Sequence, residues 1–552
     1  MIGELPRRAT SPKKAAGGAV PLLVVACVLV GFALRFGLFS TEELGLDGHL
    51  SVGLASIPVG DMLAFNLRDV HPPLFYLTLR AWLGLVSTNF IAAKWLSIAS
   101  GILAIPVLYQ IAKRTMGPLA GLMAAMLLTV SPAHIFLSAT VRDFAPGMLL
   151  STTTLLLLIL LVGDGEGRKS RASEGVLASD GEILSTSRQS FPSRSIESGQ
   201  SYPHRQRGFS RRELALGAGL SVTTGCALLT WYFHGLPLLL EVGYLIIARP
   251  RRWRLAAVAL LAGIAISLPW LAYAAPPLLA KVGGGITVSG EAPRLLEFST
   301  FAAKVASSVA GVGLFSWAVL LAYWVALLIL GAVFAMRLPR LRLLAIGSLA
   351  GTTMGLGLTF LLAGLWVYST FLTRYVLIPL PFAILAQSML ATASRVVWRR
   401  VAVMCLAALL IPSGLWYLQF IDSGPIPYDQ DPVSLYLEPR LQPGDAVIFT
   451  DIARLGFYRL RNENPVFTYA IHFTGSSFLE DNVKQRTIDL IPAVRRQHKR
   501  IWLVNSEYDK RELASLVEEA LGKPLAERVV LSNSVTSGEV LSFAGLSSGP
   551  YR

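Results

Sequence analysis

The stretch APGMLLSTTTLLLLILLV, residues 145–162, contains no charged side chain. As a helix it would nearly span the hydrocarbon core of a bilayer, which takes about 20 residues. Apolar runs of this kind recur from residue 19 to residue 420. Only 15% of the 552 residues are charged, and the mean hydropathy is +0.56; a soluble globular protein carries about 25% charged residues. The sequence therefore predicts a mainly α-helical bundle that crosses a membrane many times.

The apolar runs predict about eleven membrane spans. The shortest of them, 235–248, has fewer residues than the roughly 20 that a span needs. An odd number of spans places the N-terminus and the C-terminal region on opposite sides of the membrane. The expected spans are 19–40, 91–112, 118–136, 145–162, 213–232, 235–248, 254–273, 306–335, 341–364, 371–392 and 401–420.

The net charge of +15 does not indicate a nucleic-acid partner, because the basic residues are concentrated in alternate loops between apolar runs. This is the bias that the positive-inside rule describes. It assigns residues 1–18 to a cytoplasmic tail and 163–212, rich in Ser, Arg, Gly and Glu, to a disordered cytoplasmic loop. Residues 41–90 then form an outer loop, within which Pro72 to Val86 is expected to form a short helix against the membrane interface.

The character of the sequence changes after residue 420. Residues 445–450 and 501–504 have the composition of strands, and 511–521 has apolar residues at helical spacing. Residues 421–552 are therefore expected to form a small α/β domain on the outer side. Cys27, Cys226 and Cys405 lie inside apolar runs and show neither metal-ligand spacing nor a disulfide framework.

Polar residues gather in three segments that the topology places on the outer face. Carboxylates can accept a proton from a hydroxyl group, and arginines bind phosphate through paired hydrogen bonds. Together these segments suit a reaction between a hydroxyl acceptor and a phosphate leaving group. They contain Asp47, Asp69, His71 and Tyr76 in the first, Arg142 in the second, and Arg374 and Tyr375 in the third.

Each of these residues also has a purely structural explanation. Asp47 and Asp69 are equally suited to capping helices, and His71 to a buried hydrogen bond. Arg374 could extend to lipid headgroups. His234, within Trp231-Tyr232-Phe233-His234, fits an aromatic belt at the membrane interface as well as a binding site.

The order of these motifs resembles the membrane-embedded glycosyltransferases of the GT-C class, in the branch of protein O-mannosyltransferases and lipid A aminoarabinose transferases. The resemblance covers roughly residues 20–420. It rests on an acidic residue after the first span, an Asp-x-His-Pro-Pro-Leu-x-Tyr element, a Ser-Pro…Ser-x-x-x-Arg loop, an aromatic-His segment and an Arg-Tyr…Pro helix. These are Asp47, Asp69 to Tyr76 with Lys94 to Ser97 after it, Ser131 to Arg142, Thr230 to Leu240, and Arg374 to Pro379.

The sequence departs from the family pattern at three positions. Asp47 is followed by Gly48 where the family has a second acid, Lys94 replaces an Arg, and Asp143-Phe144 replaces Met-Tyr. The first departure puts an auxiliary acid in doubt and keeps open the alternative of an inactive scaffold with this fold.

The resemblance implies inverting sugar transfer from a polyprenyl-phosphate donor to a hydroxyl or amine of a lipid, glycan or protein. It implies a bacterial inner or plasma membrane, with the site on the extracytoplasmic face. No cofactor is required, and a need for a divalent metal is left open. The sequence offers no clear metal cage; should a metal bind, Asp47, Asp69 and His71 are the candidate ligands. A flippase of lipid-linked sugars is the competing class. The implied catalytic residues are Asp47, Asp69 and His71, the phosphate-binding residues Arg374, Arg142 and Lys94, and the substrate-binding residues Tyr76, His234 and Tyr375.

Overall fold

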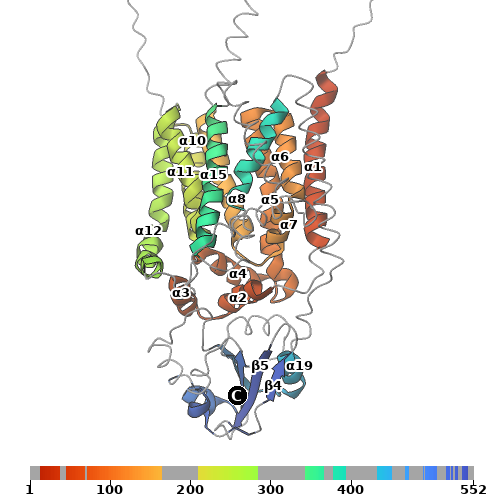
Figure 1. The fold of residues 1–552 in the computed structure, drawn as a ribbon, viewed down its shortest axis with the longest axis vertical. Coiled ribbons are helices and arrows are strands. Elements are labelled where there is room, and N and C mark those ends of the chain that lie inside the picture. The colour runs from red at the N-terminus through yellow and green to blue at the C-terminus, as the bar shows by residue number, and fades with distance from the viewer. Residues whose placement is uncertain are drawn as a thin grey trace, which may run out of the picture.

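The protein is an integral membrane protein with a helical bundle and a smaller domain that contains a β-sheet (Figure 1). The computed structural model describes residues 13–37, 45–68, 71–163, 209–250, 252–283, 342–365, 377–392, 432–449, 467–470, 489, 491–506, 517–522, 524–525, 529–532 and 537–544.

Ten helices build the described part of the bundle, and they follow the apolar runs of the sequence closely. Five of them are long and apolar enough to cross a membrane: α1, α5, α8, α10 and α12. The expected spans at 306–335 and 401–420 lie outside the described residues, so the total of eleven remains a prediction. The ten helices are α1 (Lys13–Gly37), α5 (Phe90–Met116), α6 (Pro118–Val130), α7 (Pro132–Ala139), α8 (Phe144–Gly163), α10 (Arg211–Thr230), α11 (Gly235–Ala248), α12 (Trp253–Gly283), α15 (Arg342–Leu365) and α17 (Leu380–Ser388).

The expected span at 118–136 is a broken helix. Helices α6 and α7 meet at an angle of 57°, with Ser131 between them in an extended conformation. Proline has no backbone N–H to continue the helical hydrogen bonds, and Pro132 stands at the break. Counted as one span, the pair brings the number of candidate spans to six.

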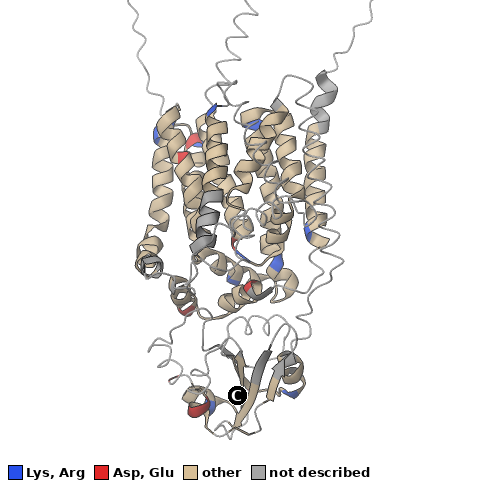
Figure 2. Ribbon diagram, in the orientation of Figure 1, with Lys and Arg blue, Asp and Glu red and all other residues tan. Residues whose placement is uncertain are grey.

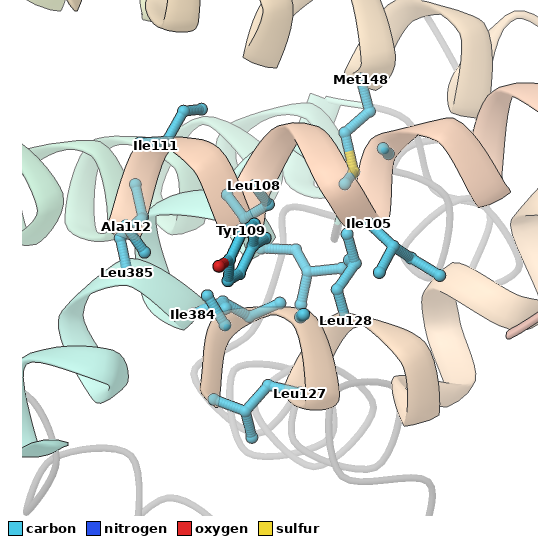
Figure 3. Close-up of a cluster of buried hydrophobic side chains, with 14 of the residues drawn as sticks. Ile105, Leu108, Tyr109, Ile111, Ala112, Leu127, Leu128, Met148, Ile384 and Leu385 are labelled. Atoms are coloured by element: carbon cyan, nitrogen blue, oxygen red, sulfur yellow. The ribbon is translucent and has the colours of Figure 1, made fainter. Parts of the chain in front are cut away.

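The centre of the bundle is packed with aliphatic side chains from helices that are far apart in the sequence (Figure 3). Ile105 and Leu108 of α5 lie in one buried cluster with Leu128 of α6 and Ile384 of α17. The cluster fixes α5 as the central helix, against which α6, α7 and α8 all pack.

Three short helices, α2 (Gly45–Ser56), α3 (Val59–Arg68) and α4 (Leu74–Leu85), lie across one end of the bundle (Figure 1). The helix expected from Pro72 to Val86 is thus present as α4. Arg80 of α4 donates to the carbonyl oxygen of Ala55 at 3.0 Å, and Trp82 Nε1 donates to that of Ala92 at 2.7 Å. These bonds tie α4 to α2 on one side and to α5 on the other.

Beyond α2–α4 lies the sheet of the C-terminal region (Figure 1). Its strand order is β2-β1-β3-β5-β4. The central strand β3 pairs parallel to β1 and antiparallel to β5. The expected strands at 445–450 and 501–504 correspond to β1 and β3. The strands are β1 (Ala446–Phe449), β2 (Phe467–Ala470), β3 (Arg500–Ser506), β4 (Val529–Ser532) and β5 (Ser537–Ala544).

The two faces of this sheet belong to different hydrophobic clusters, because alternate residues of a strand point to opposite faces. Ile501 and Leu503 of β3 pack in the cluster formed within the C-terminal region. Trp502 and Val504 belong instead to the cluster that includes Tyr76 of α4 and residues of α2. One hydrophobic cluster therefore joins the sheet to the helices that cover the end of the bundle.

Basic residues gather at the opposite end of the bundle (Figure 2). There the last turn of α5 carries Lys113 and Arg114, while α10 and α15 begin at Arg211 and Arg342. The two ends of the bundle are thus chemically different, and two of the residues singled out in the sequence, Asp47 and His71, lie at the α2–α4 end.

Candidate functional site

Arg142 is the centre of a polar cluster at the α2–α4 end of the bundle. Its Nη2 donates to Asp47 Oδ1 at 2.8 Å, and its Nη1 donates to the hydroxyl oxygen of Tyr76 at 2.9 Å. Asp47 lies in the first turn of α2 and Tyr76 in α4. The guanidinium of Arg142 therefore connects two other predicted site residues, one on α2 and one on α4.

The short connection between α7 and α8 holds Arg142 in place. The backbone N–H of Arg142 donates to the carbonyl oxygen of Thr140 at 2.8 Å. Its own carbonyl oxygen accepts from the hydroxyl of Ser97, on α5, at 3.2 Å. The main chain is thus anchored to the central helix while the side chain points toward α2 and α4.

The burial of these groups is unequal. The side chain of Arg142 is 4% exposed and that of Asp47 is 21% exposed. Burial acts to lower the pKa of Arg142, but Tyr76 and Asp47 outweigh it and raise that pKa above its ordinary value. Arg142 therefore stays charged and holds Asp47, whose carboxylate keeps a surface that a second molecule can reach.

A second pair lies directly beside the first. Nδ1 of His71 is 3.4 Å from Oδ2 of Asp143, whose side chain is 1% exposed. Asp143 Oδ1 is buried and has no hydrogen-bond partner among the described residues. Arg142 and Asp143 are adjacent in the sequence, but their side chains form ion pairs with other residues. Arg142 contacts Asp47, and Asp143 contacts His71.

Lys94 is buried in the first part of α5, one helical turn before Ser97. Its 2% exposed side chain is unusual for a lysine, which is rarely fully buried unless it has a partner. Of the predicted phosphate-binding residues, Lys94 and Arg142 therefore lie on neighbouring parts of this end of the bundle.

The structure places His234 apart from this cluster. It is fully buried, and its Nδ1 lies 3.0 Å from Oγ of Ser151 in α8. On α11, the Oε1 atom of Glu241 accepts from the hydroxyl of Thr154, also on α8, at 2.8 Å. These contacts form a polar seam between α8 and α11.

Several polar residues of the bundle were not identified from the sequence. Asp143, Glu241 and Arg35 were given no role, although all three are buried. A charged residue within an apolar run was the available signal, because such residues are costly in a membrane and usually functional. Asp69, Arg374 and Tyr375 lie outside the described residues.

No group of three or more His, Cys, Asp or Glu side chains in the described ranges is arranged to hold a metal ion. The arrangement that is present combines a partly exposed carboxylate, a buried guanidinium and a histidine paired with a carboxylate. Such a set can accept a proton and bind a polar, anionic molecule.

Residues 70–172 match the family model described as dolichyl-phosphate-mannose-protein mannosyltransferase. The matched segment is less than a quarter of the chain, and it contains Tyr76, Lys94 and Arg142. It agrees with the resemblance noted from the sequence motifs. No protein of curated function matches the chain.

Similar solved structures include ArnT, AglB and AftD. ArnT from Cupriavidus metallidurans bound to undecaprenyl phosphate shares 14% identity, with 97% of this chain and 100% of that chain covered and a TM-score of 0.46. The archaeal oligosaccharyltransferase AglB from Archaeoglobus fulgidus, in complex with an inhibitory peptide and a dolichol-phosphate, shares 10% identity, with 96% and 74% covered and a TM-score of 0.49.

The arabinofuranosyltransferase AftD from Mycobacteria shares 14% identity, with 95% of this chain and 40% of that chain covered and a TM-score of 0.46. All three TM-scores lie below 0.5, so they do not by themselves establish a common fold. Over residues 70–172 the chain is thus similar to the dolichyl-phosphate-mannose-protein mannosyltransferase family.

Proposed function

We propose that the protein is a membrane glycosyltransferase of the GT-C class, with its active site at the α2–α4 end of the bundle. The observation that carries this proposal is the contact of Arg142 with Asp47 and Tyr76. It joins the acidic residue after the first span to the two motifs that lie within the matched family segment. The family match supports sugar transfer as the chemistry.

The proposed reaction transfers a sugar from a polyprenyl-phosphate donor to a hydroxyl or amine. The acceptor oxygen or nitrogen attacks the anomeric carbon, and the bond from that carbon to the phosphate oxygen breaks. The phosphate leaves with the bonding electrons and remains on the lipid, and the configuration at the anomeric carbon is inverted. The acceptor proton passes to the carboxylate of Asp47.

The neighbouring residues are assigned supporting roles. Arg142 orients Asp47, since one of its nitrogens already binds Oδ1 of that carboxylate. Arg374, with Lys94, is proposed to stabilise the charge that develops on the leaving phosphate. Asp69 and His71 orient the acceptor, and Tyr76 and Tyr375 contact the substrates. His234, buried against Ser151 of α8, is assigned no substrate contact.

The proposed orientation places the site on the extracytoplasmic face of a bacterial inner or plasma membrane. The basic ends of α5, α10 and α15 support this, because Lys and Arg favour the cytoplasmic side of membrane proteins. The C-terminal sheet then lies outside and covers α2 and α4. Acceptors of lipid, glycan or protein type would reach Asp47 from that side.

The decisive experiment is the Asp47→Asn variant, purified and supplied with a polyprenyl-phosphate-linked sugar and an acceptor. Asparagine retains the shape and a hydrogen-bond acceptor for Arg142, but it cannot take up the proton. We expect transfer to fall about a hundredfold or more, with expression and donor binding unchanged. Turnover at the wild-type rate in this variant would remove Asp47 as the base.

The same assay separates the competing classes. A flippase would move the lipid-linked sugar across a proteoliposome membrane and leave the sugar–phosphate bond intact. An inactive scaffold would bind the donor and neither move it nor break it. Release of free polyprenyl phosphate together with glycosylated acceptor is the result expected of the wild-type protein.

A further inference from the structure

A second buried arginine lies where α6 and α7 are broken apart. Arg35, near the end of α1, has no exposed surface. Its Nη1 donates to the carbonyl oxygens of Gly31 at 2.9 Å and Thr129 at 3.4 Å, and its Nη2 contacts Nδ1 of His134 at 2.5 Å. Thr129 is in the last turn of α6 and His134 in the first turn of α7, so the guanidinium lies at the break.

This arginine has no counter-ion among the residues that the structure describes. Within the ranges that the structure describes, no Asp or Glu side chain forms an ion pair with Arg35. A buried charge costs several kcal/mol or more unless it is paired, and a bilayer makes such a position expensive. Carbonyl groups and a histidine satisfy some of its N–H groups, but none of them supplies negative charge.

Three polar atoms around the break are buried and have no hydrogen-bond partner in the described part of the chain: Arg35 Nε, His134 Nε2 and Ser131 Oγ. Arginine can only donate, so Nδ1 of His134 accepts, and the hydrogen of the neutral ring then resides on Nε2. Two of the atoms are therefore N–H donors, and the third is a hydroxyl that can also donate. Every one of them can serve an acceptor-rich ligand.

The start of α7 adds to this arrangement. Ser131 is the N-cap residue of α7, and its side chain makes no capping hydrogen bond. The first N–H groups of a helix lack partners within the helix and carry a partial positive charge. Because Pro132 has no N–H, Ala133 and His134 are the residues that offer these groups at the start of α7. Broken membrane helices use such N-termini to bind anionic groups.

We propose that the α6–α7 break is a binding site for a phosphate group, held by Arg35, His134, Ser131 and the start of α7. A phosphate offers several charged oxygens to donors from different directions, which matches this set better than a single carbonyl would. The phosphate can come from a lipid headgroup or from free phosphate. The exposed apolar side chains of α1 beside Arg35, Phe32 and Phe36, provide a surface for the chains of a lipid.

The test is binding of two probes to the full-length protein in lipid nanodiscs. The probes are inorganic phosphate and a short polyprenyl phosphate, each titrated and followed by ³¹P NMR. All measurements use the Arg374→Gln background, so that the proposed donor site does not contribute. We expect saturable binding that Arg35→Gln weakens about tenfold or more, the size of one lost charge-assisted hydrogen bond.

Two further variants keep the test decisive if Arg35→Gln folds poorly. Ser131→Ala removes one donor without changing charge and is expected to weaken binding about threefold, and Arg35→Lys is expected to retain part of the affinity. Arg252→Gln, which breaks an ion pair with Glu213 elsewhere in the bundle, is the matched control and should bind like the parent.

The outcomes are distinct. Binding of both probes in competition supports a site for the phosphate group itself, and binding of the polyprenyl phosphate alone assigns the site to a lipid headgroup. Absence of binding overturns the proposal. So does an affinity in both Arg35→Gln and Ser131→Ala that equals the affinity of the Arg374→Gln parent. Neither result depends on sugar transfer, because the assay measures binding alone.

Discussion

Arg35 and Arg142 are both buried arginines, yet their surroundings differ in one decisive respect. Arg142 lies against Asp47, whereas Arg35 contacts two carbonyl groups and a histidine. They are close neighbours: Ser97 of α5 bonds the backbone of Arg142, and Gly101, one turn further along α5, lies beside Arg35. The comparison shows that two arginines that are both buried can differ in whether a carboxylate balances their charge.

The largest effect is expected when the balanced arginine is removed. Arg142→Gln leaves Asp47 without its cation and Tyr76 without its donor, so we predict about a hundredfold loss of sugar transfer. Arg142→Lys should not restore activity, because lysine cannot bridge both partners with a planar fork. Steady-state kinetics with donor and acceptor varied separately measure this. If Arg142→Lys is fully active, the bridge between Asp47 and Tyr76 is unimportant.

Arg142→Gln should also lose more stability than Arg35→Gln. Removing one member of a buried ion pair costs about 3–5 kcal/mol, and the partial exposure of Asp47 reduces this to about 2 kcal/mol. Arg35→Gln loses hydrogen bonds but also an uncompensated charge, so we expect about 1 kcal/mol or less without phosphate. Thermal unfolding in nanodiscs tests the order. A larger loss in Arg35→Gln would mean that Arg35 is a structural group.

A smaller effect is predicted for Tyr76→Phe. The change removes the hydroxyl that accepts from Arg142 at 2.9 Å and leaves the ring in its buried cluster. The loss of one hydrogen bond to a charged group should lower kcat about tenfold, with little change in the donor KM. An unchanged kcat would show that Asp47 alone keeps Arg142 in place.

Asp143→Asn is expected to lower the rate of sugar transfer about threefold to tenfold. Asparagine keeps a hydrogen-bonding group near His71 but removes the buried negative charge beside Nδ1. The acceptor KM should rise more than kcat falls, because His71 is proposed to orient the acceptor. The double variant with His71→Gln should be no worse than the poorer single variant. An additive loss would show that Asp143 and His71 act independently.

The smallest effect is predicted at Arg252, whose pair with Glu213 is partly exposed. Exposed ion pairs contribute about 1 kcal/mol or less, so Arg252→Gln should lower the melting temperature by about 1 °C. Sugar transfer and phosphate binding should both match the wild-type protein. A loss of either would show that global stability, and not the local partners of Arg35 and Arg142, explains the other results.

The helices of the bundle were predictable because each apolar run is long enough to bury its backbone hydrogen bonds within one segment. The expected runs 91–112, 145–162 and 235–248 agree with α5, α8 and α11 to within a few residues at each end. The break at Ser131 was not anticipated, since the apolar run passes through it. It forms where Pro132 cannot donate a hydrogen bond and Arg35, distant in sequence, supplies donors to the freed carbonyl.

The residues of the candidate site were predictable in kind but not in pairing. Their types and order indicated Asp47, His71, Tyr76 and Arg142 together, and in the structure Arg142 contacts Asp47 and Tyr76. The sequence placed Arg142 with the phosphate, and only the contact with Asp47 showed that its charge is already engaged. His234 could not be separated from the cluster by sequence alone, because its distance depends on how α8 packs against α11.

The sequence by itself determined that this protein is a helical membrane protein with a polar cluster at one end and an α/β region after the bundle. Hydrophobic length and charge bias act locally along the chain, so they can be read without knowing which helices touch. Tertiary structure alone decided which charges are balanced. Arg142 contacts a carboxylate that is 95 residues away in the sequence, whereas Arg35 contacts a broken helix. Neither contact can be inferred from one segment of the sequence alone.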